Sequence, residues 1–261
     1  MEEDQVVARL RAAGCVFAEE EARLLGEAAG TPADLEAMVG QREKGLPLEQ
    51  VVGWADFCGL RIFVDPGVFV PRRRSEFLVA TAVSLASGAS PVIVDLCCGT
   101  GALGLAVAAR LAAAGRAAGL HAADIDPAAG GCARRNVEPA GGRVYQGDLF
   151  APLPAELRGR VTVLICNAPY VPTGDIALLP PEARDYEPRT ALDGGSDGLA
   201  VLRRAAAEAP RWLAPGGVLL VETSDPQAPL MTRVMTAAGL TGRVHRCAEY
   251  ESTVVTGTAP G

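Results

Sequence analysis

Residues 164–173, LICNAPYVPT, place a polar amide, a proline and an aromatic ring at the end of an apolar run. Asn167 offers an amide oxygen as a hydrogen-bond acceptor, and Pro169 favours an extended backbone at Ala168. The Ala168 carbonyl can then face the same way as the Asn167 side chain, so that two acceptors hold both protons of a substrate NH2 group. The nitrogen lone pair is left facing an electrophile, while the ring of Tyr170 packs on the planar amide.

This arrangement predicts catalysis by orientation and by exclusion of water, with no general base required before transfer. The plain alternative is a strand-to-loop turn, because strand ends generally carry turn residues. Taken alone, the four residues do not decide between the two interpretations.

A second segment with chemical potential is DLCCGTGALG, residues 95–104, where an apolar run meets Gly99-Thr100-Gly101 and then a helical pattern. Glycines permit a tight turn and the close approach of a ligand to the backbone. No Gly-Lys-Ser/Thr follows, as a phosphate-binding loop requires, and the dinucleotide spacing GxGxxG is not met. An ordinary strand–helix turn is the alternative, but the position after the first strand of a predicted sheet favours a ligand site.

Two further strand ends carry aspartates. Asp124, in the segment AADID, can accept both hydroxyls of a ribose; Asp126 is a second candidate, or else the cap of the next helix. Asp148, in GDLF, can accept the exocyclic amine of an adenine, and a turn aspartate is the alternative. The three segments together describe a site for adenosine with a free ribose diol and no phosphate loop. S-adenosylmethionine fits that description better than NAD or ATP does.

The elements that must bring these segments together follow from residue 91 onward, where apolar runs alternate with helical patterns. This alternation predicts an α/β fold, a doubly wound, seven-stranded, Rossmann-like sheet that is mostly parallel, with an antiparallel pair at one edge. A long loop is expected over 167–196. Strands are expected at 91–98, 119–126, 143–150, 161–166, 216–223, 242–250 and 252–257, and helices at 99–115, 127–137, 197–213 and 226–239.

Three parts are expected along the chain. Residues 1–45 have helical patterns and predict a small helical domain that packs on the rest or recognises a substrate. Residues 46–72 predict a hairpin linker, with its turn at Asp65-Pro66-Gly67. Residues 73–261 then form the cofactor-binding domain.

Composition excludes several classes of function. The net charge is −7, so no affinity for a nucleic-acid backbone is expected, and no apolar stretch is long enough to span a membrane. Seven cysteines without CxxC spacing, and no signal-like N-terminus, predict reduced thiols in a cytoplasmic protein. The two histidines, His121 and His245, lie near no ligand or nucleophile motif, so neither a metal site nor a Ser-His-Asp triad is expected.

With these residues assembled, the chain resembles the protein-(glutamine-N5) methyltransferases, the HemK/PrmC family, from about residue 42 onward. DLCCGTG, ADIDP, GDLF and NAPY are similar to the family's cofactor loop, ribose-binding strand end, adenine-side loop and Asn-Pro-Pro-Tyr motif. The segment YEPRTALDGGSDGL, residues 186–199, is similar to the family's loop after the catalytic motif. That segment is the most specific signal, since other amino-methylating families share Asn-Pro-Pro-Tyr without it.

The resemblance implies an S-adenosylmethionine-dependent methyltransferase whose substrate is a protein, the glutamine of the Gly-Gly-Gln motif in peptide-chain release factors. It implies no membrane partner, and nucleic acid is not expected. The target amide would be held by Asn167, Ala168, Pro169 and Tyr170. The cofactor would contact Asp95, Cys97, Cys98, Gly99, Thr100, Gly101, Asp124, Asp148, Leu149 and Asn167.

Three departures from the family pattern put the substrate in question more than the reaction. Cys97 stands where a glycine is typical, and Ala168 replaces a proline, at a cost in rigidity of roughly 0.4–1 kcal/mol. The run PRRRSE replaces Pro-Arg-Pro-Glu-Thr-Glu; we interpret Arg72–Arg74 as a solvated basic turn rather than a contact for an acidic substrate. A divergent branch with another protein or a small molecule as substrate is one outcome. The alternatives are an N6-adenine nucleic-acid methyltransferase, in which Tyr170 stacks on a flipped base, and a cofactor-binding module without turnover.

Overall fold

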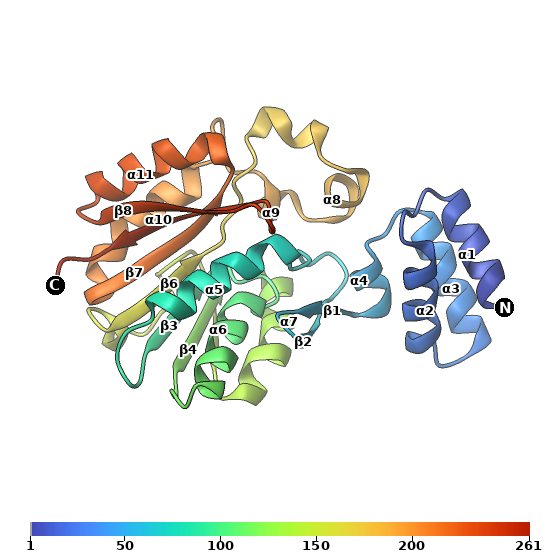
Figure 1. Ribbon diagram of the computed structural model, residues 1–261, viewed down its shortest axis with the longest axis horizontal. Helices are drawn as coiled ribbons and strands as arrows, with labels where there is room; N and C mark the ends of the chain where they lie inside the picture. Colours follow the sequence, from blue (N-terminus) through green and yellow to red (C-terminus); the bar gives the residue numbers. More distant parts are fainter. Residues whose placement is uncertain (1) are drawn as a thin grey trace.

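The computed structural model describes residues 2–261, and its first part is a helical bundle at one end of the molecule (Figure 1). The helices are α1 (Glu3–Ala12), α2 (Ala18–Ala28), α3 (Pro32–Glu43) and the short α4 (Leu48–Val52). Thr31 caps α3, since its side-chain oxygen accepts a hydrogen bond from the Asp34 amide at 3.2 Å. The apolar core of the bundle is formed by Val6, Leu10, Ala18, Ala22, Leu25, Val39 and Val51, so α4 packs with the helices that precede it.

A two-stranded hairpin connects the bundle to the rest of the chain, as predicted, but its turn lies elsewhere. Strands β1 (Trp54–Phe57) and β2 (Leu60–Phe63) are antiparallel and are joined at Cys58-Gly59. Both turn residues have positive φ, 53° and 78°, which matches the right-handed twist of a hairpin. Asp65-Pro66-Gly67 does form a turn, closed by the Val68 amide, which donates to the Asp65 carbonyl at 3.1 Å, but the prediction that it joins two strands was wrong, because the next described element is the 3-10 turn Arg73–Ser75.

The third part is a seven-stranded sheet in the order β5-β4-β3-β6-β7-β9-β8. All neighbouring pairs from β5 to β7 are parallel, and β9 lies between β7 and β8, antiparallel to both. The predicted doubly wound sheet with an antiparallel edge is confirmed. The strands are β3 (Val92–Leu96), β4 (Gly119–Asp124), β5 (Arg143–Gln146), β6 (Val161–Cys166), β7 (Leu213–Thr223), β8 (Thr241–Cys247) and β9 (Ser252–Thr258).

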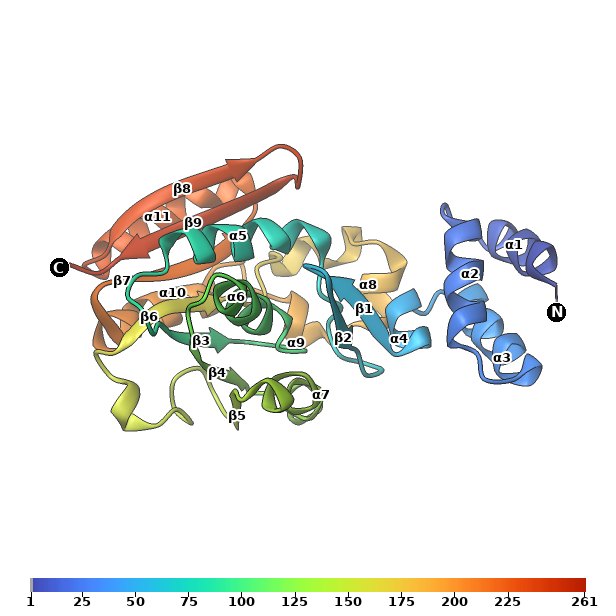
Figure 2. The same ribbon diagram turned by 60° about the horizontal axis from the view of Figure 1, so that its bottom comes forward.

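Helices cover both faces of this sheet (Figure 2). On one face lie α5 (Glu76–Leu85), α6 (Ala102–Ala113) and α7 (Pro127–Val137); on the other lie α10 (Ala200–Glu208) and α11 (Ala228–Ala237). The apolar run of β3 is buried from both sides, because Ile93 packs in one core cluster and Val94 and Leu96 in the other. None of the helices within residues 2–261 is long and apolar enough to cross a membrane.

The segment 167–196, expected as a long loop, contains a 3-10 turn at Thr173–Leu178 and two short helices, α8 (Pro181–Tyr186) and α9 (Arg189–Leu192). It contacts the helical bundle and the hairpin side of the molecule. Arg42 donates to Glu182 at 2.9 Å, and the Tyr186 hydroxyl donates to the Lys44 carbonyl. The segment therefore links the bundle to the carboxyl edge of the sheet, where α8 is seen in Figure 1.

Candidate active site

A cavity of about 780 Å³ opens at the carboxyl edge of the sheet. The ends of β3, β4, β5 and β6 meet there, because parallel strands place their carboxyl ends on one side. The cavity is lined by Cys97, Cys98, Gly99, Thr100, Asp124, Asp148, Leu149, Asn167, Ala168, Pro169 and Tyr170. Of the residues predicted from the sequence, these eleven line one cavity and Asp95 and Gly101 do not.

The turn after β3 depends on three residues with left-handed backbone angles. Cys97, Gly99 and Gly101 have φ of 54°, 56° and 77°. A Cβ at Gly99 would meet nothing within 4 Å, so that position is open toward the cavity. A Cβ at Gly101 would lie 2.6 Å from Val137 Cγ2, so that glycine is needed for the packing of the turn against α7.

Cys97 occupies the position where a glycine is typical in the resembled family, and its φ of 54° explains that preference. A left-handed non-glycine residue stores about 1–2 kcal/mol of strain. Its thiol lies against Cys166 at the end of β6, and this contact, together with burial, raises the pKa of Cys97 well above its ordinary value. The thiol therefore stays neutral and unreactive at ordinary pH.

Asp95 lies beneath the turn and is fully buried. One carboxylate oxygen accepts a hydrogen bond from the Gly104 amide at 2.8 Å, which fixes the start of α6. The other oxygen, Oδ1, has no hydrogen-bond partner within residues 2–261. Burial raises the pKa of Asp95 to about 7. Asp95 supports the turn from below, away from the residues that line the cavity.

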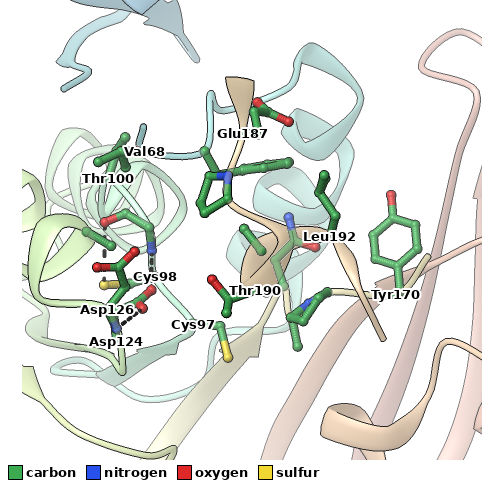
Figure 3. Close-up of a pocket in the computed structure, with 18 of the residues that line it drawn as sticks. Val68, Cys97, Cys98, Thr100, Asp124, Asp126, Tyr170, Glu187, Thr190 and Leu192 are labelled. Atoms are coloured by element: carbon green, nitrogen blue, oxygen red, sulfur yellow. Dashed lines mark hydrogen bonds between the residues drawn. The ribbon is translucent and has the colours of Figure 1, made fainter. Parts of the chain in front are cut away.

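Asp124 and Asp126 divide the two roles that the sequence left open. Asp124 accepts the Gly99 amide at 2.8 Å on Oδ2 and the Asp126 amide at 2.9 Å on Oδ1. Each carboxylate oxygen has a second lone-pair site, so Asp124 keeps acceptor capacity for a ligand. Asp126 is the cap of α7, with its carboxylate accepting the Ala128 amide at 2.8 Å. Figure 3 shows both aspartates grouped with Cys98 and Thr100 on one side of the pocket.

Asp148 lies at the exposed rim of the cavity and pairs with Arg204 of α10 at 2.5 Å. The next residue, Leu149, is buried and has a left-handed φ of 48°, which turns the chain at this strand end. Arg204 also lines the cavity. Arg204 was not among the predicted site residues, because the sequence around an arginine in a helix does not indicate which residue it will pair with.

Tyr170 lies at the other end of the pocket from the two aspartates, with Cys97 and Thr190 between them in Figure 3. Its hydroxyl donates to Glu222 Oε1 at 2.8 Å, and its carbonyl accepts from the Gln227 side chain at 2.8 Å. Burial raises the pKa of Tyr170 well above its ordinary range, so the hydroxyl stays protonated. The Asn167 side chain makes no hydrogen bond within residues 2–261 and lines the cavity, so its amide is free for a ligand.

Arginines 72 to 74 were predicted to form a solvated basic turn, and their side chains do remain partly or largely exposed, but two of them also pair with buried carboxylates. Arg72 donates to Glu187 at 2.6 Å, and Arg74 donates to Glu222 at 3.1 Å. Both glutamate side chains are almost fully buried, whereas those of Arg72 and Arg74 are 33% and 48% exposed, so each arginine balances a buried charge from the surface. These partners could not be predicted from the sequence, because they lie more than a hundred residues away from the arginines.

The segment 186–199 packs directly on the backbone of residues 167–171. A Cβ at Gly194 would lie 2.6 Å from the Pro169 carbonyl oxygen, and a Cβ at Gly198 would lie 2.2 Å from that of Tyr170. The Gly194 amide also donates to the Val171 carbonyl at 2.9 Å. These two glycines are therefore required for the segment to hold the catalytic loop in place.

Replacement of Gly198 by alanine is expected to lower the activity of this site at least tenfold and to destabilise the protein by about 2–3 kcal/mol. The added methyl group must displace the Tyr170 carbonyl, and the backbone φ of 77° is unfavourable for alanine. Rates and thermal midpoints measure the two effects. Gly174→Ala is the matched control, because a Cβ there meets nothing within 4 Å. Equal behaviour of the two variants would contradict the packing argument.

The fold and the cavity define the class of Rossmann-like methyltransferases. Solved structures support the fold: a methyltransferase from Pyrococcus furiosus has a TM-score of 0.56 at 17% identity, with 78% of this chain and 90% of that chain covered. The ribosomal protein L11 methylase of Lactobacillus delbrueckii has a TM-score of 0.53 at 13% identity, over 76% and 84% of the two chains. A family model, the methyltransferase small domain, matches residues 59–178.

Curated relatives define the family. The release factor glutamine methyltransferase of Geobacter sulfurreducens is 39% identical over 77% of this chain and 69% of its own length. The protein of the same name from Mycolicibacterium smegmatis is 43% identical over 74% and 67%. A 4-amino-L-phenylalanine/4-methylamino-L-phenylalanine methyltransferase from Streptomyces pristinaespiralis is 36% identical over 74% and 66%.

The chain belongs to the release factor glutamine methyltransferase family. It is a methyltransferase that depends on S-adenosylmethionine, and the enzyme class and cofactor predicted from the sequence are confirmed. This membership favours the main prediction over an adenine methyltransferase and over a module that only binds the cofactor.

Proposed function

We propose that this protein methylates the side-chain amide nitrogen of a glutamine in a peptide-chain release factor. The observation that carries the proposal is the position of Asn167 and Tyr170: one has a free amide and the other a fixed ring, and both line the cavity that also contains Asp124. The names of the similar proteins from Geobacter sulfurreducens and Mycolicibacterium smegmatis support the choice of substrate.

The residues of the cavity fit the cofactor. The turn at Gly99 leaves open space where a side chain would stand, and Asp124 retains acceptor sites after its two backbone hydrogen bonds. In this proposal Asp124 accepts the ribose hydroxyls, Asp148 and Leu149 flank the adenine, and residues 97–100 contact the methionine end. When bound, S-adenosylmethionine supplies an electrophilic methyl group. Asp95 and Gly101 act indirectly, because they shape the turn from beneath.

The acceptor amide is held by hydrogen bonds and not by a base. The Asn167 amide oxygen and the Ala168 carbonyl accept the two N–H protons, and Tyr170 packs on the amide plane. The lone pair is thereby kept out of conjugation with its carbonyl and directed toward the cofactor side of the cavity. The proton leaves the nitrogen only after the new N–C bond forms, so no buried base is required.

The helical bundle is proposed to recognise the substrate protein. Its α1–α2 connection exposes two adjacent large apolar side chains, Val16 and Phe17, which are 84% and 69% accessible. Exposed apolar side chains of this size are typical of contact surfaces. A negative net charge makes a nucleic-acid substrate unfavourable, and the seven free cysteines are consistent with a cytoplasmic location.

A second candidate substrate is an aromatic amine. The relative from Streptomyces pristinaespiralis carries such a substrate in its name and is nearly as similar to this chain as the release factor enzymes are. Ala168 in place of the family's proline leaves less bulk beside the acceptor, which would suit a larger planar group.

The test is incubation of the purified protein with isotopically labelled S-adenosylmethionine and a bacterial release factor, followed by peptide mass spectrometry. One methyl group is expected on a single glutamine, and none on a release factor in which that glutamine is replaced by alanine. 4-Amino-L-phenylalanine and an adenine-containing DNA oligonucleotide serve as competing acceptors. Methylation of either one in preference to the release factor overturns the proposal.

A further inference from the structure

A second cavity of about 530 Å³ lies next to the first and shares Arg74 and Tyr170 with it. It is formed where the end of β7 meets the start of β9, with Thr223 and Thr253 as paired residues. The cofactor loop, the ends of β4 and β5 and the segment 186–199 do not line this second cavity. Of the motifs that resemble the family's, only NAPY contributes to it, through Tyr170.

Three buried polar atoms in the wall of this cavity lack hydrogen-bond partners within residues 2–261: Glu222 Oε2, Thr223 Oγ1 and Ser252 Oγ. Their residues are only 2%, 4% and 4% exposed. A buried polar atom without a partner costs about 1–3 kcal/mol, and such atoms are rare in folded proteins. Three of them around one cavity make that cavity a candidate site for a polar ligand.

The charges around the cavity favour a neutral ligand. Arg74 donates to Glu222 at 3.1 Å, and Arg246 donates to Asp225 at 2.5 Å, so the buried carboxylate and its neighbour are each already paired. Glu251 stands exposed at the rim. The one carboxylate outside these two ion pairs, Glu251, is solvated at the rim, so the buried part of the wall offers no unpaired charge to an ionic ligand.

The unpaired atoms also specify the kind of neutral group. Glu222 Oε2 can only accept a hydrogen bond, whereas the hydroxyls of Thr223 and Ser252 can donate or accept. A group that carries both an N–H donor and a C=O acceptor satisfies all three. The peptide group has this composition, so the polypeptide that carries an acceptor amide in the first cavity can supply it to the adjoining one.

We propose that the second cavity binds a main-chain amide of the polypeptide segment that carries the methyl acceptor, beyond the two peptide groups that adjoin the acceptor residue itself. This inference rests on the proposed function, in which that acceptor is a glutamine of a protein. Tyr170 lines both cavities, and its hydroxyl donates to Glu222 Oε1, whereas Glu222 Oε2 is the oxygen without a partner. The flanking peptide therefore docks behind the ring that packs on the acceptor amide, and Thr223 and Ser252 act as specificity-determining residues for a peptide substrate.

The experiment compares two probes by calorimetry, with S-adenosylhomocysteine present: Nα-acetyl-L-glutamine N-methylamide and the peptide acetyl-Ala-Ala-Gln-Ala-Ala-amide. The peptide is expected to bind the unsubstituted protein more tightly than the single residue. Thr223→Val and Ser252→Ala are each expected to weaken peptide binding by about three- to tenfold and to leave the single residue unchanged, because each removes one hydrogen bond of the flank.

Ser84→Ala is the matched control, since it removes a hydroxyl from α5 outside both cavities. It is expected to bind both probes like the unsubstituted protein. Equal binding of the two probes by the unsubstituted protein overturns the inference. Equal weakening of both probes by Thr223→Val or Ser252→Ala also overturns it, because that result indicates a structural role.

A methyl-transfer assay with the same samples separates this inference from the proposed function. Peptide binding that depends on Thr223 and Ser252, without transfer to any glutamine, supports the second cavity and contradicts the proposed function. Transfer to glutamine, with binding indifferent to both hydroxyls, supports the function and overturns the role of the cavity.

Discussion

Asn167→Ala is expected to lower the rate of methyl transfer by about 10³-fold, with little change in cofactor affinity. The substitution removes one of the two acceptors that hold the target amide, so the nitrogen lone pair returns to conjugation with its carbonyl. The side chain makes no hydrogen bond within residues 2–261, which leaves nothing in the fold for the alanine to disturb. Steady-state rates with release factor, and calorimetry with S-adenosylhomocysteine, measure the two quantities.

Thr162→Val is the control for Asn167→Ala, because it reports any general effect on the rate of a substitution in β6. Thr162 lies in β6 upstream of Asn167, and its hydroxyl donates to the Val92 carbonyl at 3.0 Å, remote from the cavity. We expect its rate to fall no more than about threefold, in line with the loss of one neutral hydrogen bond. Full activity of Asn167→Ala would show that the amide is oriented by other groups, and the acceptor geometry proposed here would be abandoned.

The cofactor side of the site could be predicted because each signal lies within a few residues of a strand end. Parallel strands bring their carboxyl ends to one edge, so Gly99, Asp124, Asp148 and Asn167 had to converge once the alternation of strands and helices was recognised. The continuous apolar run of β3 supported the same prediction, because apolar residues at consecutive positions are typical of a strand that is covered on both faces of its sheet.

Partners from distant segments could not be predicted, because no local pattern encodes them. Arg74 belongs to a run of three arginines, which predicted a solvated turn; the side chain is 48% exposed, but it also pairs with the buried carboxylate of Glu222. The turn of the hairpin was misplaced for a related reason. Asp65-Pro66-Gly67 is a strong turn signal, and it does form a bend, but the hairpin closes at Cys58-Gly59, where a cysteine adopts a left-handed angle.

The two aspartates after β4 were also ambiguous in sequence, and the structure separates them by what their oxygens already hold. Asp126 caps a helix, which is a local task. Asp124 joins two loops of the cavity, since it accepts one amide from the turn after β3 and one from its own strand end. The same carboxylate that shapes the turn thus also lines the cavity.

Asp124→Ala is accordingly expected to weaken cofactor binding by about 10²- to 10³-fold. Two hydrogen bonds from ribose hydroxyls to a carboxylate account for that loss, because each contributes about 1.5–3 kcal/mol. This range leaves out any relaxation of the turn after the substitution. The maximal rate at saturating cofactor should fall much less, which is the reverse of the result expected for Asn167→Ala. Calorimetry with S-adenosylhomocysteine gives the affinity, and rates over a wide range of cofactor concentration give the saturating value.

Asp126→Ala provides the control, because it removes the neighbouring carboxylate and leaves Asp124 in place. We expect a loss of about 1 kcal/mol of stability from the missing helix cap, and cofactor affinity within about threefold of the unsubstituted protein. If Asp126→Ala instead weakens the cofactor as much as Asp124→Ala does, the ribose is held by the pair or by Asp126. The division of roles between a structural cap and a ligand contact would then be wrong.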